Sequence, residues 1–319
     1  MKISVIGCGR WGSFLAWYLD KIGHKVTLYG RASSKNMQAL LATRKNSLLS
    51  LPQSVELVTE LSAISDAEAV VISVDSQGLR GVFEELSKKW LTDKSFVLCM
   101  KGIEISTGKR LSEVAEEFLT PPGSVAVWIG PGHVQEFYAG IPNCMVIDSK
   151  DEALKRRMVD EFSSELIRLY YGDDLVGNEI GAAAKNVIGI AAGMLDGRGL
   201  SSLKGALMAR GAREVSRLIK DMGGNELSAY GLCHLGDYEA TVFSGYSHNR
   251  RFGEAFVRGE SAEGLAEGYY TVCALMKLCE KYGTEMPICT AVYKILYENQ
   301  KPEEALDGLF GRKLNREFY

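Results

Sequence analysis

The chain lacks the long apolar run that a membrane-spanning helix needs. No uncharged apolar stretch reaches about eighteen residues, and the nearest approach, residues 180–195, contains Lys185. The N-terminus also lacks the charged, apolar and cleavage segments of a secretory signal, so its apolar run is expected to be a strand. These absences predict a protein without a membrane span.

Metal-binding and nucleic-acid-binding patterns are missing as well. The 7 cysteines are scattered without a CxxC pair and there are only 4 histidines, so we expect no metal site. An odd, dispersed set of cysteines is typical of reduced thiols in a cytoplasmic enzyme. A net charge of −3 at pH 7 indicates neither a nucleic-acid partner nor an anionic membrane surface. A small anionic substrate would therefore need a local basic pocket.

What the chain does have is a dinucleotide-binding pattern at its N-terminus. An apolar run at residues 3–6 leads into Gly7, Gly9 and Gly12 at the GxGxxG spacing, and a helical pattern and a second apolar run at residues 26–29 follow. In such a βαβ unit the first glycine permits the turn, the second lets backbone approach a pyrophosphate, and the third allows close helix–strand packing. The helix N-terminus presents free N–H groups to the phosphates. The pattern therefore predicts a bound NAD or NADP.

The residues after the second strand bear on which dinucleotide binds. An NAD site usually has a carboxylate there, which accepts a hydrogen bond from the ribose 2′-OH. This chain has no carboxylate at that point and instead has Arg31, Ser33, Ser34 and Lys35, which suit a 2′-phosphate. NADP is therefore favoured over NAD, and the alternative is that this segment is a solvated loop.

The order of strand and helix patterns divides the chain into two parts. Up to residue 171, apolar strand patterns alternate with helical ones, which is typical of a doubly wound α/β sheet. Beyond about residue 175 only helical patterns follow, so we expect a Rossmann-type domain at residues 1–178 and an all-helical domain at residues 179–319. The other predicted strands are residues 69–74, 95–100, 124–129, 143–147 and 167–171, and the predicted helices include residues 79–91, 111–118, 180–195, 206–221, 264–282 and 287–299.

Lys185 is the first candidate for catalysis, because it lies among small and apolar residues of a predicted helix. Burial disfavours the charged ammonium and lowers a lysine pKa from about 10.4 toward the operating pH. Such a lysine suits general acid–base chemistry between a carbonyl and an alcohol. The alternative is that Lys185 extends from a helix edge to water.

Three other places carry candidate groups. Lys101 follows a buried strand, at the sheet edge where doubly wound folds bind ligands, and it can polarise a carbonyl or hold an anion; the alternative is a surface-loop lysine. Asp237 can orient a catalytic lysine or simply cap the next helix. Residues 244–253 contain two arginines, a histidine, an asparagine and serines between glycines, and they can hold a phosphate or form a solvated loop.

Taken together, these positions resemble the bacterial-type NAD(P)-dependent glycerol-3-phosphate dehydrogenases over nearly the whole chain. The glycine-rich opening at residues 7–12 resembles the family's N-terminal glycine motif. Lys101-Gly102-Ile103-Glu104 resembles the family's Lys-Gly-Ile/Leu-Glu motif. Ala184-Lys185-Asn186-Val187, Gly236-Asp237 and Asn249-Arg250-Arg251-Phe252-Gly253 are the most specific matches. Further similar blocks are residues 74–80, 191–193, 206–207, 210–211, 267–269, 285–288 and 291–293.

The resemblance implies interconversion of dihydroxyacetone phosphate and sn-glycerol 3-phosphate with NAD(P)H, which supplies phospholipid backbones. It gives Lys185 the role of proton donor and acceptor, with Lys101 and Asp237 as further catalytic residues. We expect the substrate to bind in the cleft between the domains and the helical half to contribute to a homodimer. The residues expected to bind cofactor are Gly7, Gly9, Arg10, Trp11, Gly12, Arg31, Lys101, Val134, His248 and Glu267. The residues expected to bind substrate are Lys101, Gly130, Gly132, Lys185, Asp237, Ser247, His248, Asn249 and Arg250.

Two residues depart from the family pattern at positions expected near the substrate. Gly132 stands where the family has a serine or threonine, with His133 beside it, so a hydroxyl is lost. His248 stands where the family has an arginine that helps to hold the substrate phosphate and the cofactor, and it is charged only when protonated, with a reference pKa near 6.5. These departures keep open a related reductase of another small keto acid or keto phosphate. A non-catalytic dinucleotide sensor is the other alternative, although the candidate catalytic residues are all retained.

Overall fold

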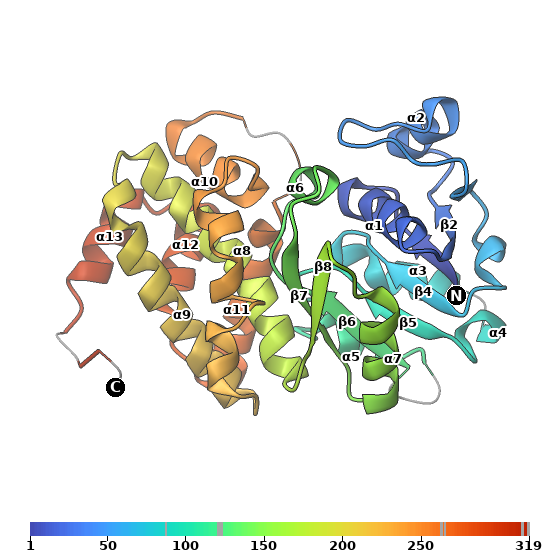
Figure 1. The fold of residues 1–319 in the computed structure, drawn as a ribbon. Coiled ribbons are helices and arrows are strands. Elements are labelled where there is room, and N and C mark those ends of the chain that lie inside the picture. The colour runs from blue at the N-terminus through green and yellow to red at the C-terminus, as the bar shows by residue number, and fades with distance from the viewer. Residues whose placement is uncertain (87, 120–123, 262–263, 265, 314–315, 318–319) are drawn as a thin grey trace. The chain divides into compact units, whose positions relative to one another are not determined.

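The computed structural model describes residues 1–86, 88–119, 124–261, 264, 266–313 and 316–317, and the chain divides into two compact units (Figure 1). The first unit comprises residues 1–100 and 111–173, and the second comprises residues 101–110 and 174–319. The second unit therefore begins a few residues before the expected boundary at 178. It also includes the segment that starts at Lys101, which the sequence did not indicate.

The described strands all belong to the first unit and form a single sheet in the order β3-β2-β1-β4-β5-β6-β7-β8. Neighbouring strands are parallel except β6 and β7, which are antiparallel. The doubly wound α/β prediction is confirmed, and only β3, too short to show a periodic pattern, was not predicted. The strands are β1 Lys2–Ile6, β2 Lys25–Tyr29, β3 Glu56–Val58, β4 Ala69–Ile72, β5 Ser95–Leu98, β6 Val125–Ile129, β7 Asn143–Asp148 and β8 Ile167–Tyr171.

Helices cover both faces of this sheet, and aromatic rings hold them there. On one face, Trp128 of β6 stacks on Phe162 of α7 at 5.3 Å, and Phe137 of α6 stacks on Phe14 of α1 at the same distance. The other face carries α3. The predicted helix over residues 79–91 is wrong as one element, because Leu86 adopts an extended ψ of 128°, and residue 87 lies outside the described part. The helices of this unit are α1 Arg10–Lys21, α2 Lys35–Thr43, α3 Leu79–Glu85, α4 Lys88–Leu91, α5 Leu111–Glu116, α6 Val134–Tyr138 and α7 Glu152–Phe162.

The second unit is helical, as predicted, and α8 packs against α9, α10, α11 and α12. Small residues explain the close packing of α8 on α10. A Cβ on Gly193 would lie 1.8 Å from the carbonyl oxygen of Arg250, and one on Gly253 would lie 2.1 Å from that of Ile190. The helices are α8 Leu175–Gly197, α9 Lys204–Asp221, α10 His248–Arg258, α11 Glu267–Tyr282, α12 Pro287–Tyr297 and α13 Pro302–Phe310. The predicted helix over residues 264–282 therefore begins later, and residue 265 lies outside the described part.

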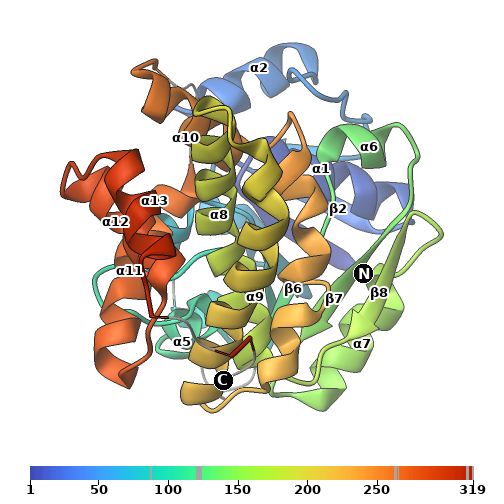
Figure 2. The same cartoon turned by 90° about the vertical axis from the view of Figure 1, so that its left-hand side faces the viewer.

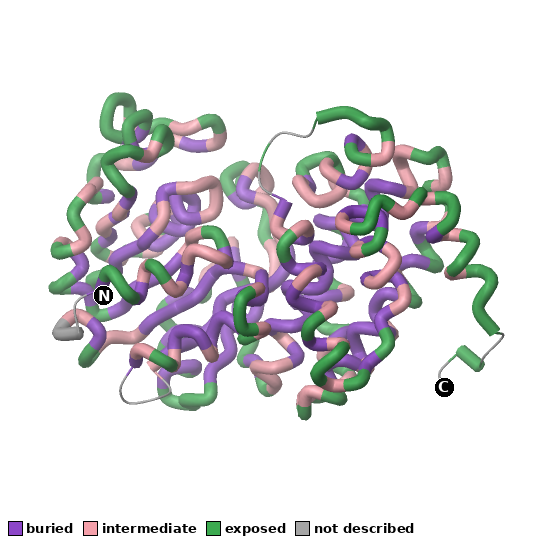
Figure 3. The backbone as a smooth tube through the Cα atoms, turned by 180° about the vertical axis from the view of Figure 1, so that it is seen from behind, coloured by how far each residue is buried: buried purple, intermediate pink, exposed green. Residues whose placement is uncertain are grey.

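Each unit has its own apolar core. The buried residues follow the strands in the first unit and the central helix α8 in the second (Figure 3). No described helix combines the length and apolar character needed to cross a bilayer.

Candidate functional site

The glycine-rich turn of the first unit has the conformation that a dinucleotide site needs. Gly7 has a φ of +110°, and a Cβ there would lie 2.1 Å from the carbonyl oxygen of Ser73. A Cβ on Gly12 would lie 1.8 Å from the carbonyl oxygen of Gly7, whereas one on Gly9 would meet no described atom within 4 Å. The first and third glycines thus permit the turn and close packing, and Gly9 leaves open space for a ligand. These residues fit a bound pyrophosphate.

The N-terminus of α1 is suited to an anion, because no side chain in the described part of the chain caps it and its first turn has no carboxylate. Two predicted cofactor residues lie at this end. The Arg10 guanidinium donates to Oε1 of Gln135 at 3.4 Å, and the Trp11 ring lies 6.1 Å from that of Phe137. Both contacts are to α6, whose first residue is the predicted cofactor residue Val134. The structure thus brings Arg10, Trp11 and Val134 together.

The segment after β2 is open to solvent. Arg31 and Lys35 are exposed, and Ser34 caps α2 by accepting a hydrogen bond from the backbone N–H of Met37. Arg31 is therefore accessible to a ligand, and Ser34 already has a structural role.

The two glycines after β6 have backbones that exclude most other residues. Gly130 has a φ of +143°, and a Cβ there would lie 2.9 Å from Cα of Met145. Gly132 has a φ of +135°, and its Cβ would lie 2.2 Å from Cε2 of the Phe137 ring. A serine at position 132 would be strained and would collide with that ring. The loss of the hydroxyl is thus matched by the local packing.

The second unit brings the three predicted catalytic residues into one cluster. The Nζ atom of Lys101 lies 2.6 Å from Oδ2 of Asp237, and the Nζ atom of Lys185 lies 2.7 Å from the same oxygen. The Lys185 side chain is 8% exposed and that of Asp237 only 1%, whereas Lys101 is 23% exposed. Lys185 therefore does not extend to water, and Asp237 accepts hydrogen bonds from lysines instead of capping a helix.

Burial gives Lys185 a pKa suited to proton transfer. Desolvation lowers the pKa of Lys185 from 10.5 to about 8, with Asp237 opposing this fall and Lys101 adding to it. The second carboxylate oxygen, Oδ1 of Asp237, is buried without a hydrogen-bond partner among the described residues. It remains an acceptor for a hydroxyl group.

Two residues that were not predicted complete the cluster. The Lys185 ammonium donates to Oγ1 of Thr241 at 2.7 Å, and this hydroxyl donates to the backbone carbonyl of Asp237, also at 2.7 Å. The Asn186 amide donates to the carbonyl of Lys101 at 3.4 Å and accepts from Nδ2 of Asn249 at 3.1 Å. Asn186 directly follows Lys185 and lies in the same family-like motif, which was the signal for it in the sequence.

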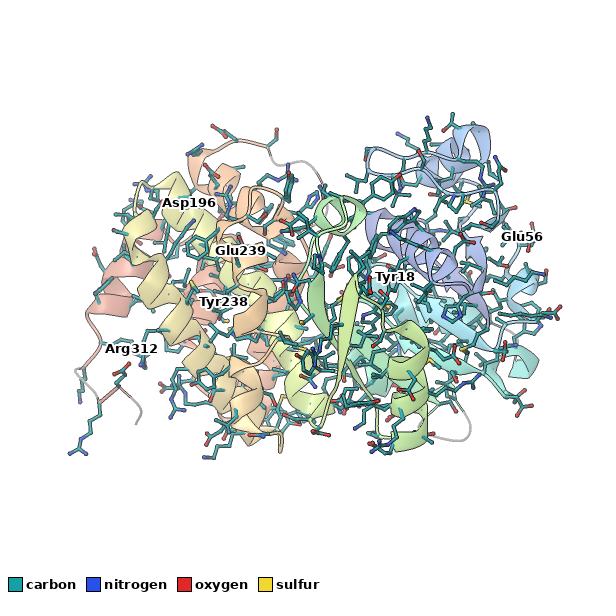
Figure 4. All side chains as sticks on the ribbon, in the orientation of Figure 1. Tyr18, Glu56, Asp196, Tyr238, Glu239 and Arg312 are labelled. Carbon is teal, nitrogen blue, oxygen red and sulfur yellow. The ribbon has the colours of Figure 1, made fainter. Side chains whose placement is uncertain are left out.

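A buried histidine anchors the turn that carries Asp237. Burial lowers the pKa of His234 to about 4, so the ring is neutral at neutral pH. Its Nδ1 lies 2.8 Å from the carbonyl oxygen of Gly181, which can only accept, so Nδ1 carries the hydrogen. Nε2 then accepts from the hydroxyl of Tyr238 at 2.7 Å (Tyr238 is labelled in Figure 4). Gly181 lies one helical turn before Lys185 on α8, so this contact anchors the turn that carries Asp237 beside Lys185.

A buried ion pair anchors the segment that carries Lys101. The Arg110 guanidinium donates to Oε2 of Glu179 on α8 at 2.6 Å, with both side chains less than a tenth exposed. Both residues were missed at the sequence level, because neither lies in a recognisable motif.

Residues 247–250 form the first turn of α10 and not a solvated loop. Ser247 caps this helix by accepting from the N–H of Arg250 at 3.2 Å. The Arg250 guanidinium donates to carboxylates of Asp196 at 2.7 Å and Glu254 at 3.2 Å (Asp196 is labelled in Figure 4). The ring of His248 is partly exposed, and an Arg251 nitrogen lies 3.3 Å from its Nδ1.

The amide of Asn249 joins α10 to α11. Its Oδ1 accepts from the backbone N–H of Gly268 at 2.9 Å, next to the predicted cofactor residue Glu267, which begins α11. Over the part of the chain that the structure describes, no group of three or more His, Cys, Asp and Glu side chains could hold a metal ion.

Comparison with known proteins identifies relatives over the full length of the chain. Family models described as NAD-dependent glycerol-3-phosphate dehydrogenase N-terminus and C-terminus match residues 2–155 and 174–307. A glycerol-3-phosphate dehydrogenase [NAD(P)+] of Thermoanaerobacter sp. (strain X514) is 37% identical, covering 100% of this chain and 99% of the relative. One of Pelodictyon phaeoclathratiforme (strain DSM 5477 / BU-1) is also 37% identical, covering 99% of each chain. The crystal structure of the Coxiella burnetii glycerol-3-phosphate dehydrogenase superposes with a TM-score of 0.89 at 28% identity, covering 98% of this chain and 99% of that one.

Proposed function

Because this chain belongs to the NAD(P)-dependent glycerol-3-phosphate dehydrogenase family, it is an oxidoreductase that interconverts dihydroxyacetone phosphate and sn-glycerol 3-phosphate, and we propose that Lys185 moves the proton in this reaction. The observation that carries this proposal is the buried Lys185 ammonium, 2.7 Å from the Asp237 carboxylate. A pKa of about 8 keeps both protonation states of this lysine accessible near neutral pH.

The proton transfer follows from this position. The nicotinamide cofactor supplies the hydride when it is bound. In reduction, Nζ of Lys185 gives its proton to the oxygen on C2 of dihydroxyacetone phosphate, and in oxidation the neutral amine takes the proton back. Thr241 and Asp237 hold the ammonium in one orientation, since both accept hydrogen bonds from it.

Lys101 and Asp237 act on the charge that develops during the reaction. The more exposed ammonium of Lys101 stabilises the negative oxygen as the alkoxide forms. Asp237 holds the two ammonium groups together against their mutual repulsion, and its unpaired Oδ1 accepts a substrate hydroxyl.

For the cofactor, we propose binding by the glycine-rich turn with Arg10, Trp11 and Val134, together with Lys101, His248 and Glu267 of the second unit. Exposed Arg31 and the lack of a carboxylate after β2 support NADP over NAD.

For the substrate phosphate, we propose Ser247, His248, Asn249 and Arg250, with Gly130 and Gly132 as further substrate residues. The ion pairs of Arg250 with Asp196 and Glu254 indicate that this arginine also fixes α10.

We also propose a homodimer, a cytoplasmic location and a role in lipid synthesis. A homodimer through the second unit is supported by large apolar side chains that are exposed there, Leu227, Phe243 and Tyr246. A cytoplasmic location is supported by the cysteines, all of which are free. Glycerol 3-phosphate is the backbone of phospholipids, so we also propose a role in their synthesis.

A spectrophotometric assay tests the proposed roles and substrate. NADPH and NADH oxidation are followed with dihydroxyacetone phosphate and with a panel of small keto acids, for the wild type and Lys185→Ala. We expect turnover with dihydroxyacetone phosphate that depends on Lys185. A higher kcat/KM with a keto acid would contradict the substrate assignment, and an active Lys185→Ala enzyme would contradict the role of the lysine.

A further inference from the structure

A cavity of about 670 Å³ lies within the second unit and is not used by the proposed reaction. Its walls come from the C-terminal half of α8 and from α9, α12 and α13, which lie side by side in Figure 2. None of Lys101, Lys185 and Asp237 lines it. The volume is that of a small-molecule site, which typically measures about 300–1,000 Å³.

The walls of the cavity combine aliphatic side chains with charged ones, and the aliphatic side chains come mainly from the helices. They include Met194 and Leu195 of α8, Ile288 and Val292 of α12, and Leu306 of α13. An alkyl chain buries against these aliphatic side chains without leaving a polar atom unpaired. Aromatic stacking is limited, since a single phenylalanine is the only aromatic side chain among the described lining residues. An unbranched alkyl chain fits these walls.

Two arginines on α9 bring positive charge to the cavity. The Arg210 guanidinium donates to the carbonyl of Glu317 at 2.8 Å, and that of Arg217 donates to the carbonyl of Glu285 at 2.9 Å. Within the described ranges, neither guanidinium forms an ion pair with a carboxylate. Because a guanidinium has five N–H donors, both keep donors for a ligand.

Positive charge is concentrated around Arg217. Burial lowers the pKa of Arg217, and the guanidinium groups of Arg213, Arg210 and Arg312 lower it further, against the opposing effect of Glu214. A bound anion relieves this repulsion. Six cationic and four anionic side chains of the described residues line the cavity, so a negatively charged head group meets a net positive surrounding.

We propose that this cavity binds a long-chain fatty acid. The alkyl chain lies against the aliphatic walls, and the carboxylate accepts hydrogen bonds from Arg210 and Arg217, whose planar guanidinium groups match it. This binding site is separate from the proposed reaction, so its test does not depend on turnover.

Titration calorimetry of the full chain with octanoate, decanoate and dodecanoate, below their micelle concentrations, tests whether the cavity binds the alkyl chain. We expect one site per chain and an affinity that rises about fourfold for each added methylene. Dodecyltrimethylammonium has the same chain and the opposite charge, and we expect it to bind at least about tenfold more weakly. Absence of saturable dodecanoate binding, or equal affinity for the two head groups, would overturn the proposal.

Variants locate the binding in this cavity. Ala291 lines it, so Ala291→Phe should fill it and weaken dodecanoate binding at least about tenfold while glycerol 3-phosphate oxidation persists. The double variant Arg210→Gln with Arg217→Gln should weaken the binding of dodecanoate but leave the binding of dodecanol unchanged. It tests the location of the site even if Ala291→Phe does not fold. Arg168→Gln, which removes an exposed arginine of the first unit, is the matched control. Wild-type dodecanoate affinity in the double variant would overturn the proposal.

Discussion

Lys185 and Asp237 form a buried contact in which the ammonium nitrogen lies 2.7 Å from a carboxylate oxygen that also binds a second lysine. Asp237 opposes the fall in the pKa of Lys185 that burial causes, so removing its charge should lower that pKa further.

The variant Asp237→Asn tests this relationship through the pH dependence of reduction. Reduction needs protonated Lys185, so its rate in the wild type should fall as pH rises through about 8, and the rate of oxidation should rise through the same pH. In Asp237→Asn we expect the reduction midpoint at lower pH and kcat at least about tenfold lower, since a charge-assisted hydrogen bond is lost. Asp173→Asn, an exposed carboxylate, is the control. An unchanged midpoint in Asp237→Asn would contradict the proposed coupling.

Cofactor preference should depend on Arg31. Because this exposed arginine follows β2 where an NAD site has a carboxylate, we expect kcat/KM for NADPH to equal or exceed that for NADH. Arg31→Asp should shift the ratio toward NADH by about tenfold or more, as one charge-assisted contact to the 2′-phosphate is replaced by repulsion. Lys25→Asp, at an exposed position on the same strand β2, serves as control. A wild type that prefers NADH, with no response to Arg31→Asp, would show that Arg31 is only a solvated residue.

His248 should make substrate affinity depend on pH. A dianionic phosphate favours the imidazolium, so KM for dihydroxyacetone phosphate should rise from pH 6 to 8, after correction for the second phosphate ionisation near pH 6. The expected change in KM corresponds to about 1–3 kcal/mol of binding free energy. His248→Arg should flatten the dependence and lower KM at high pH.

The alternative for the phosphate is Arg251, which stays charged and whose guanidinium lies 3.3 Å from His248 Nδ1. If Arg251 alone holds the phosphate, KM shows no histidine-like rise and His248→Arg is neutral. Arg250 is a weaker candidate for this role, because its guanidinium is already paired with Asp196 and Glu254.

Glu214 should make the stability of the second unit depend on pH. Burial raises the pKa of this carboxyl from 4.5 to about 7, although the backbone N–H groups of Ile288 and Cys289 donate to it. With the folded pKa raised, its contribution to stability is present below pH 4.5 and is lost as pH rises to about 7. This rise in pKa corresponds to a change of on the order of 3 kcal/mol in the free energy of unfolding.

Thermal unfolding of Glu214→Gln measures this effect. The variant loses one acceptor for the N–H groups that begin α12, so it should be less stable than the wild type at pH 5. Because it cannot ionise, its Tm relative to the wild type should rise between pH 5 and 8. A Tm difference that stays constant over this range would contradict the account. Glu280→Gln, an exposed glutamate of α11, is the control.

The parts of the fold that could be predicted are those set by local pattern. The glycines of the first turn were predicted because their spacing and the flanking strand and helix patterns occur together, and the structure gives Gly7 a positive φ. Helix α10 was missed because its first turn is a run of polar residues, and what defines it is the Ser247 cap and the close approach of Gly253 to α8.

The candidate site was predictable only as single residues. A lysine in a helix of small residues predicted burial, and Lys185 is buried. Its hydrogen bond to Thr241 and the link from Asn186 to the carbonyl of Lys101 join segments far apart in the sequence, so no local pattern contains them. The same holds for the pair of His234 and Tyr238, which forms only because the turn that carries Asp237 lies against Gly181 of α8.

The central claim is that Lys185 transfers the proton, and single-turnover reduction by Lys185→Ala tests it most directly. With saturating NADPH and dihydroxyacetone phosphate, the rate of NADPH oxidation in the first turnover should fall by about a hundred- to ten-thousand-fold, while the Kd for NADPH, measured by fluorescence, stays within about threefold of the wild type. Lys155→Ala removes another buried lysine, on α7 of the first unit and outside the cluster, so it is the control for burial alone and should keep its single-turnover rate. A Lys185→Ala rate within about tenfold of the wild type would contradict the account.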